Sequence, residues 1–222
     1  MEFCSCMKKI FPEYLKDILE EDFLLLDKYL DIKEYKAHQI LKHPNETESV
    51  SRLVLSGFGV TMEMDEEGEY KVDRVYKQGE ILMDSFSYKF NRPTKSLIKS
   101  YSVIKVAELT KEAEKSLLED HPQLNALSAV INYHILLIEK SWIKILNAPL
   151  GHRHEMFLHN FKIVSNHISI IDLAHLLKMG YSTLKDKRRK AADKIAMERL
   201  KQKEKYKINP LDIKVYSYSS ID

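Results

Sequence analysis

The spacing of hydrophobic residues changes along the chain, and each spacing predicts a different element. Residues 11–29 place leucine, isoleucine and phenylalanine three and four positions apart, which predicts an amphipathic helix. The next segment instead holds short β-type runs, at residues 51–55, 60–64, 70–76 and 100–109. Thr110 follows the last run and is a plausible N-cap for another helix. The pattern predicts six to eight short strands between residues 35 and 109.

Three of the six glycines mark the turns between these strands. Gly57, Gly68 and Gly79 stand eleven residues apart, and no solenoid-type sequence repeat accompanies that spacing. Residues 65–68 read Asp-Glu-Glu-Gly between two strands, which predicts a hairpin turn whose glycine supplies a positive φ. Turns at this spacing indicate a compact antiparallel roll or barrel.

Residues 122–148 carry the longest helical pattern, bounded by Pro122 and Pro149. We expect a helix of roughly 23 residues. Its apolar stripe is too wide for one neighbour, so we expect the roll to cover one side and a second copy of the helix the other, giving a homodimer. A single wide stripe buried in a monomeric core is the alternative. The stripe comprises Leu124, Leu127, Ile131, Ile135, Ile138 and Trp142.

Residues 149–222 predict a smaller helical domain after the roll domain at 1–121 and the long helix at 122–148. Helices are expected at 152–161, at 170–178 and from Tyr181 onward, with Ser169 or Asp172 capping the second. The link Lys178-Met179-Gly180 has the length of the turn in a helix-turn-helix, with Gly180 expected in its unusual backbone position. Residues 213–218 alternate like a strand.

Charge is distributed unevenly along the 222 residues. Lysine and arginine number 35 against 33 aspartates and glutamates, yet residues 185–207 hold eleven bases and only four acids. A basic segment on an acidic body favours a polyanionic partner. A solvated helix face with charge pairs four residues apart is the alternative.

These features together resemble the Crp/Fnr family of bacterial transcription regulators. The resemblance begins at Tyr35, includes Gln78-Gly79-Glu80, and resumes at residues 168–177 and 182–184. It implies an α+β fold with an N-terminal antiparallel β-roll of the cyclic-nucleotide-binding, jelly-roll type. A long dimerisation helix and a C-terminal helix-turn-helix of winged-helix type would follow. The implied function is DNA-binding transcription regulation by a homodimer, with double-stranded DNA and RNA polymerase as partners.

The effector site departs from the family pattern. Nucleotide-binding members carry Gly-Glu where this chain has Met83-Asp84, and Arg-Ser/Thr-Ala where it has Thr94-Lys95-Ser96. Losing the arginine removes the bidentate partner of a cyclic phosphate, unless Lys95 or Arg92 replaces it. The effector is therefore expected to be an unidentified small molecule rather than cyclic AMP. The expected pocket comprises Met83, Asp84, Ser85, Thr94, Lys95 and Ser96.

The reading helix also differs from the family, because it begins with Tyr181-Ser182 and carries Asp186. We expect its short polar residues to face the bases and its cations to contact phosphates. The alternative is a dimeric scaffold or small-ligand sensor that has lost sequence-specific DNA binding. The expected DNA-binding residues are Tyr181, Ser182, Thr183, Lys185, Lys187, Arg188 and Arg189.

Other functional classes find no support in the sequence. No nucleophile elbow, phosphate-binding loop or dinucleotide fingerprint occurs, so we do not expect an enzyme. His152, His154 and His159 lack the spacing of ligands on one helix face, and Cys4 and Cys6 are too few for an iron–sulfur or zinc site, so neither metal nor cofactor is expected. Without a signal peptide or an apolar stretch long enough to span a bilayer, the expected location is the cytoplasm.

Overall fold

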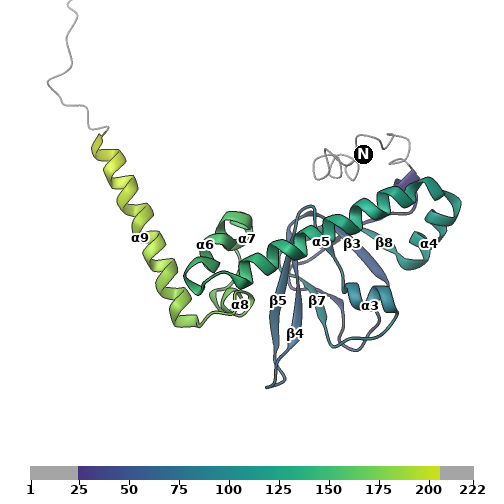
Figure 1. Ribbon diagram of the computed structural model, residues 1–222, viewed down its shortest axis with the longest axis horizontal. Coiled ribbons are helices and arrows are strands. Elements are labelled where there is room, and N and C mark those ends of the chain that lie inside the picture. Colours follow the sequence, from purple (N-terminus) through teal and green to yellow (C-terminus); the bar gives the residue numbers. More distant parts are fainter. Residues whose placement is uncertain (1–24, 206–222) are drawn as a thin grey trace, which may run out of the picture. The chain divides into compact units, whose positions relative to one another are not determined.

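A computed structural model of the chain describes residues 25–205, in which eight strands form two four-stranded antiparallel sheets (Figure 1). The first sheet has the order β1 (Asp31–Tyr35), β8 (Ile104–Thr110), β3 (Val50–Ser56) and β6 (Ile81–Leu82). The second has the order β2 (Ile40–Lys42), β7 (Leu97–Ser100), β4 (Phe58–Met64) and β5 (Tyr70–Lys77). The predicted antiparallel β-roll is confirmed.

The first sheet packs against side chains on both of its faces. Val54 and Val106 point into the roll, where they join Leu82, Ile98 and Ile104 in a fully buried cluster. Neighbouring residues on the same strands point the other way, because side chains alternate along a strand. These outward-pointing side chains form a second, outer cluster together with residues that follow or precede the strands. The outer cluster comprises Leu26, Leu53, Leu55, Ala107, Leu117, Leu124 and Leu127.

The three evenly spaced glycines all adopt a positive φ, at 74° for Gly57, 84° for Gly68 and 88° for Gly79. Gly68 closes the predicted hairpin between β4 and β5. Gly57 lies between β3 and β4, and a Cβ there would stand 2.1 Å from the carbonyl oxygen of Val103. Glycine is therefore required at Gly57 both for its backbone angle and for the close approach.

Two features of the roll differ from the sequence prediction. The alternating run at 100–109 is not one strand: β7 ends at Ser100 and β8 begins at Ile104, because the amides of Tyr101 and Ser102 turn to donate to the carbonyl of Phe58. A short helix, α3 (Ser85–Phe90), was not predicted and lies between β6 and β7. It is too short to display a helical period.

The helices that follow the roll agree with the prediction. The hydroxyl of Thr110 accepts a hydrogen bond from the amide of Ala113 and caps α4 (Lys111–Asp120). A 3-10 turn at Pro122–Leu124 leads into α5 (Asn125–Asn147), whose 23 residues match the expected length. Figure 1 shows α5 lying along the roll. Of the helix expected at 11–29, residues 11–24 lie outside the described part.

Three further helices precede Gly180, namely α6 (Leu150–Asn160), the unpredicted α7 (Lys162–Ser165) and α8 (Ile170–Leu176). The Ser169 hydroxyl caps α8, as expected, by accepting from the amide of Asp172. The prediction for Gly180 was wrong: Lys178 itself takes the left-handed conformation, with φ of 51°, so the glycine is not needed there.

The chain divides after Gly180 into two compact units. The roll and helices α4 to α8 belong to the first unit, and α9 (Tyr181–Lys205) belongs to the second. The expected division into residues 1–121, 122–148 and 149–222 remains a prediction from sequence. The pairing of α8 with α9 in a helix-turn-helix also remains a prediction. The strand expected at 213–218, which would supply a wing, lies outside the described residues.

Candidate functional site

Three of the residues expected in the effector pocket join a buried polar cluster around Lys42. The ammonium of Lys42, whose residue is 3% exposed, lies 3.4 Å from a carboxylate oxygen of Asp84. It also donates to the hydroxyl of Thr94 at 3.1 Å and to the carbonyl of Ser96 at 2.9 Å. The cation beside Thr94 is therefore Lys42, whereas Lys95 and Arg92, the candidates from sequence, are exposed.

Both carboxylate oxygens of Asp84 are already engaged. One accepts a hydrogen bond from the amide of Ser87 at 3.0 Å and so caps α3, while the other accepts from the Thr94 hydroxyl and pairs with Lys42. Buried polar groups are stable when they satisfy one another in this way. Asp84 is the acid that the family resemblance would assign to a ribose hydroxyl, and its carboxylate is therefore already bound to groups of the protein itself.

A second buried network stands next to this cluster. The guanidinium of Arg52 binds Glu48 at 3.1 Å and Glu108 at 3.2 Å, and the Tyr35 hydroxyl donates to Glu108 at 2.6 Å. Burial is the larger cause and this hydrogen bond the next largest of a rise in the pKa of Tyr35 to about 12. The sequence does not distinguish these residues, because isolated charges in strands are typical of a solvated face.

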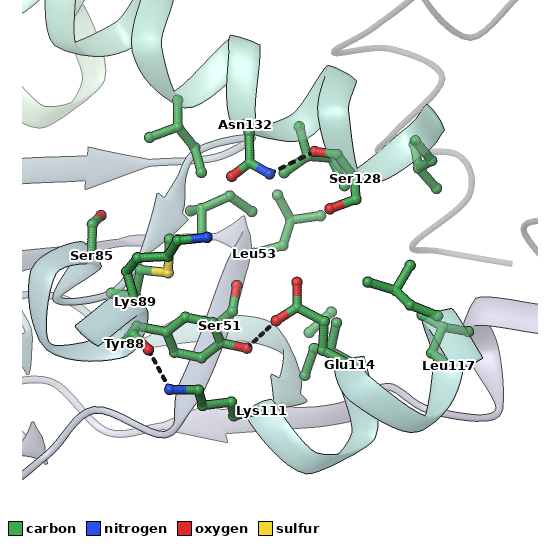
Figure 2. A pocket seen from close by; sticks show the side chains of 18 of the residues that line it. Ser51, Leu53, Ser85, Tyr88, Lys89, Lys111, Glu114, Leu117, Ser128 and Asn132 are labelled. Carbon is green, nitrogen blue, oxygen red and sulfur yellow. Dashed lines mark hydrogen bonds between the residues drawn. The ribbon is translucent and has the colours of Figure 1, made fainter. Parts of the chain in front are cut away.

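A cavity of about 790 Å³ lies outside the roll, between the outer face of the first sheet and helices α3, α4 and α5 (Figure 2). Met83 and Ser85 line it, whereas the other four expected pocket residues do not. The six residues therefore do not form one pocket. Asp84, Thr94 and Ser96 belong to the Lys42 cluster, and the carbonyl of the exposed Lys95 accepts from the hydroxyl of Tyr70.

The stripe expected to face a second copy lies mainly against this chain itself. Leu124, Leu127 and Trp142 are buried, and Ile131 and Ile135 line the cavity. Ile138, the sixth residue, is partly buried beside β5. Three buried side chains are therefore unavailable to a partner, although dimerisation itself stays a prediction.

A different face of α5 is exposed and apolar. Tyr133, Leu136 and Ile143 are each about half exposed, at 50%, 52% and 54%. Together with Ala126, Ala129 and Lys140 they follow the alternating three- and four-residue spacing of a coiled-coil seam. We refer to these six residues as the exposed seam of α5.

One set of contacts joins α5 to the end of α6, and a second attaches α8 to the roll. Trp142 of α5 packs on Phe161, with ring centroids 4.7 Å apart. The hydroxyl of Tyr101 donates to the carboxylate of Asp172 in α8 at 2.5 Å and accepts from the amide of Ser169 at 2.9 Å. Phe58 stacks on the Tyr101 ring at 5.2 Å, which holds the tyrosine in place. The first helix of the expected helix-turn-helix is thus fixed to the roll.

The expected DNA-binding residues occupy the first three turns of α9. Tyr181, Ser182, Thr183, Lys185 and Arg189 are exposed. Within the same turns, Lys187 and Arg188 are half-buried. Arg189 also lies 3.4 Å from Asp186, and both side chains are largely exposed, so this contact is weak. Lys185 and Arg189 lie one helical turn apart and therefore share a face.

Two further features of the described residues concern other classes of function. Residues 25–205 contain no group of three or more potential metal ligands, and Cys4 and Cys6 lie outside that range. None of the helices in the described part is both long and apolar enough to cross a membrane.

Comparison of the sequence with known families and with curated proteins gives no match. The structure, in contrast, resembles solved bacterial regulators. FixK2 from Bradyrhizobium japonicum superposes with a TM-score of 0.62 at 10% identity, covering 74% of this chain and 85% of FixK2. CLP from Xanthomonas campestris, described as a c-di-GMP-responsive global regulator, gives 0.57 at 13% identity, covering 78% and 92%. CooA from Carboxydothermus hydrogenoformans, solved as a mutant, gives 0.53 at 14%, covering 78% and 80%.

These similarities define the class of fold. A β-roll followed by a long helix and a smaller helical region is the arrangement expected from sequence, and the chain has the fold of the Crp/Fnr-type regulators. At 10–14% identity the likeness extends to the fold and not to ligands or partners.

Proposed function

We propose that this protein is a homodimeric DNA-binding transcription regulator of the Crp/Fnr type whose effector is not cyclic AMP. The observation that carries the proposal is the exposed basic start of α9, which follows a Crp/Fnr-type fold in the chain. RNA polymerase is a partner by family resemblance only.

In the proposed complex the exposed face of α9 enters the major groove. Ser182 and Thr183 are short enough to reach base edges, and the longer Lys185 and Arg189 reach phosphates. Lys187 and Arg188 are half-buried and take a smaller share in phosphate binding than their charges alone suggest. Tyr181, 48% exposed, is the remaining candidate for base contact.

The exposed seam of α5 is the proposed dimer surface. Its residues repeat at the spacing that packs two parallel helices, and Lys140 at a seam position favours pairing in one register. Two-fold symmetry would place two copies of α9 on successive turns of the duplex, about 34 Å apart.

The contacts of Tyr101 provide a route from roll to DNA-binding region. Because its hydroxyl binds both Asp172 and Ser169 at the start of α8, movement of the segment between β7 and β8 would move that helix. An effector that favours one position of α8 would then change DNA affinity by shifting a population of states.

Cyclic AMP is a poor candidate for that effector. The residues that would meet its phosphate and ribose are bound to each other, since Asp84 pairs with Lys42 and accepts from Thr94. A nucleotide would have to separate a buried ion pair without gaining an arginine in return.

The test is duplex binding by the full chain, measured by fluorescence anisotropy over a range of salt concentrations. Replacing Lys185 or Arg189 by Ala should weaken binding to all sequences alike. Each lost phosphate contact should lower the salt slope by about one, and a dimer loses two per substitution. Lys115→Ala is the matched control, because Lys115 is an exposed helical lysine of α4 in the other unit.

Ser182→Ala should instead change the preference among sequences with little effect on the salt slope. The second candidate function, a dimeric scaffold or ligand sensor, is favoured by the exposed Asp186, because a carboxylate among the basic residues of α9 would repel DNA phosphates. Salt slopes that are identical for Lys185→Ala, Arg189→Ala and Lys115→Ala would favour that alternative.

A further inference from the structure

The cavity outside the roll has the size and composition of a ligand site. At about 790 Å³ it lies within the range of pockets that enclose small molecules. The cavity is separate from the buried network around Arg52, because side chains alternate along β3. Ser51 and Leu53 of β3 line the cavity, whereas Arg52 between them binds Glu48 and Glu108 within the buried network.

Most of the cavity wall is apolar. The sheet contributes Leu53, Ile81 and Ala107, and the helices contribute leucine and isoleucine side chains from α4 and α5. Such a wall accepts a hydrocarbon chain or an aromatic ring, and burial of that surface would drive binding.

The polar groups of the cavity differ in whether they already have partners. The hydroxyl of Tyr88 donates to Glu114 at 2.6 Å, and Lys111 donates to the carbonyl of Tyr88 at 2.6 Å (Figure 2). Asn132 donates to the carbonyl of Ser128 at 3.0 Å. These contacts hold α3, α4 and α5 around the cavity.

Lys89 has no such partner. Figure 2 shows its ammonium directed into the cavity, towards Leu53 and Asn132. Within residues 25–205 its ammonium makes no hydrogen bond or ion pair. An ammonium at the edge of an apolar cavity is suited to bind the anionic head of a ligand whose body fills that cavity.

We propose that this cavity binds a small amphipathic carboxylate, with its hydrocarbon body between the sheet and α5 and its carboxylate at Lys89. The ligand would contact α3, α4 and α5 at once. Its role as an effector rests on the proposed DNA-binding function, but its binding does not.

Calorimetric titration of the full chain with dodecanoate and with dodecanol tests the proposal, because the two probes differ only in the head group. Dodecanoate should bind in the micromolar range and dodecanol about tenfold more weakly, for loss of the charge-assisted contact. Lys89→Met should reduce dodecanoate binding to the level of dodecanol and leave dodecanol unchanged. Lys115→Met, on the same protein but away from the cavity, should change neither.

Filling the cavity provides the second arm. Ile131→Trp should abolish binding of both probes. If the Ile131→Trp chain does not fold, Ser128→Phe replaces it, because Ser128 is a half-buried residue of the same cavity and the substitution should have the same effect. The proposal is overturned if neither probe binds the wild-type chain, or if binding survives in folded filled variants. Equal responses of both probes to Lys89→Met would likewise overturn the assignment of the head group. Since no arm uses DNA, failure here leaves the proposed regulator untouched.

Discussion

Replacing Lys42 by Met should destabilise the roll strongly. The Lys42 ammonium is buried and contacts Asp84, Thr94 and the carbonyl of Ser96. Methionine has a similar length and keeps the apolar packing, so the substitution removes charge and hydrogen bonds while leaving volume nearly unchanged. The carboxylate of Asp84, in a residue only 9% exposed, then loses its nearby cation.

Removing one member of a buried ion pair costs about 3–5 kcal/mol, because the other charge stays desolvated. For a protein of this size that loss corresponds to a fall in Tm of roughly 6–20 °C. Asp84→Asn should also destabilise, since it leaves the Lys42 ammonium unpaired. In the double variant both charges are absent, so its loss should be smaller than the sum of the two single losses.

Urea unfolding followed by fluorescence of Trp142 measures these differences, because Trp142 is the only tryptophan and is 1% exposed in the same unit. Lys115→Met, which removes an exposed pair with Glu119 3.8 Å away, is the control and should cost less than about 1 kcal/mol. The reasoning is refuted if Lys42→Met costs no more than the control, or if the Lys42 and Asp84 effects simply add.

Three further predictions concern pH, assembly and nucleotide binding. Burial raises the pKa of Glu80 to about 7, so ionisation of this carboxyl opposes folding increasingly as the pH rises from the ordinary glutamate pKa, and the penalty is complete above about pH 7. Glu80→Gln should therefore be nearly neutral at pH 4 and stabilising by up to about 3 kcal/mol at pH 8, in urea titrations at both pH values. Leu136→Glu with Ile143→Glu should convert a dimer into monomers in sedimentation without loss of helical signal, because both side chains are about half exposed; a wild-type monomer at micromolar concentration would contradict the dimer. Cyclic AMP should give no heat in calorimetric titration, and micromolar binding that Asp84→Ala removes would show that the Lys42 cluster opens.

The architecture of the roll was predictable because its signals are local. Glycines at turns, the strand runs at 51–55, 60–64 and 70–76 and the Thr110 cap depend on neighbouring residues, and each of these is found in the structure. The long helix was predictable from its period and its flanking prolines. The direction of its apolar stripe was not, because period identifies a face without saying whether the roll or a second copy covers it.

The buried polar contacts around Lys42 could not be predicted from the sequence. Lys42 ends a three-residue strand, and Asp84 and Thr94 stand ten residues apart, so only the folded chain brings them together. The cavity is equally non-local, since β3, α3 and α5 each provide part of its wall. Lys89 carried no signal in the sequence beyond that of any lysine, because α3 itself was not predicted.

Selection of bound duplexes from a random-sequence library tests the central claim most directly, using the full chain at about 50 mM salt. The account predicts enrichment of an inverted repeat whose half-sites are centred about one helical turn apart, with loss of that preference in Ser182→Ala. Failure to retain any duplex at this salt concentration, where the basic face of α9 should act most strongly, would contradict it.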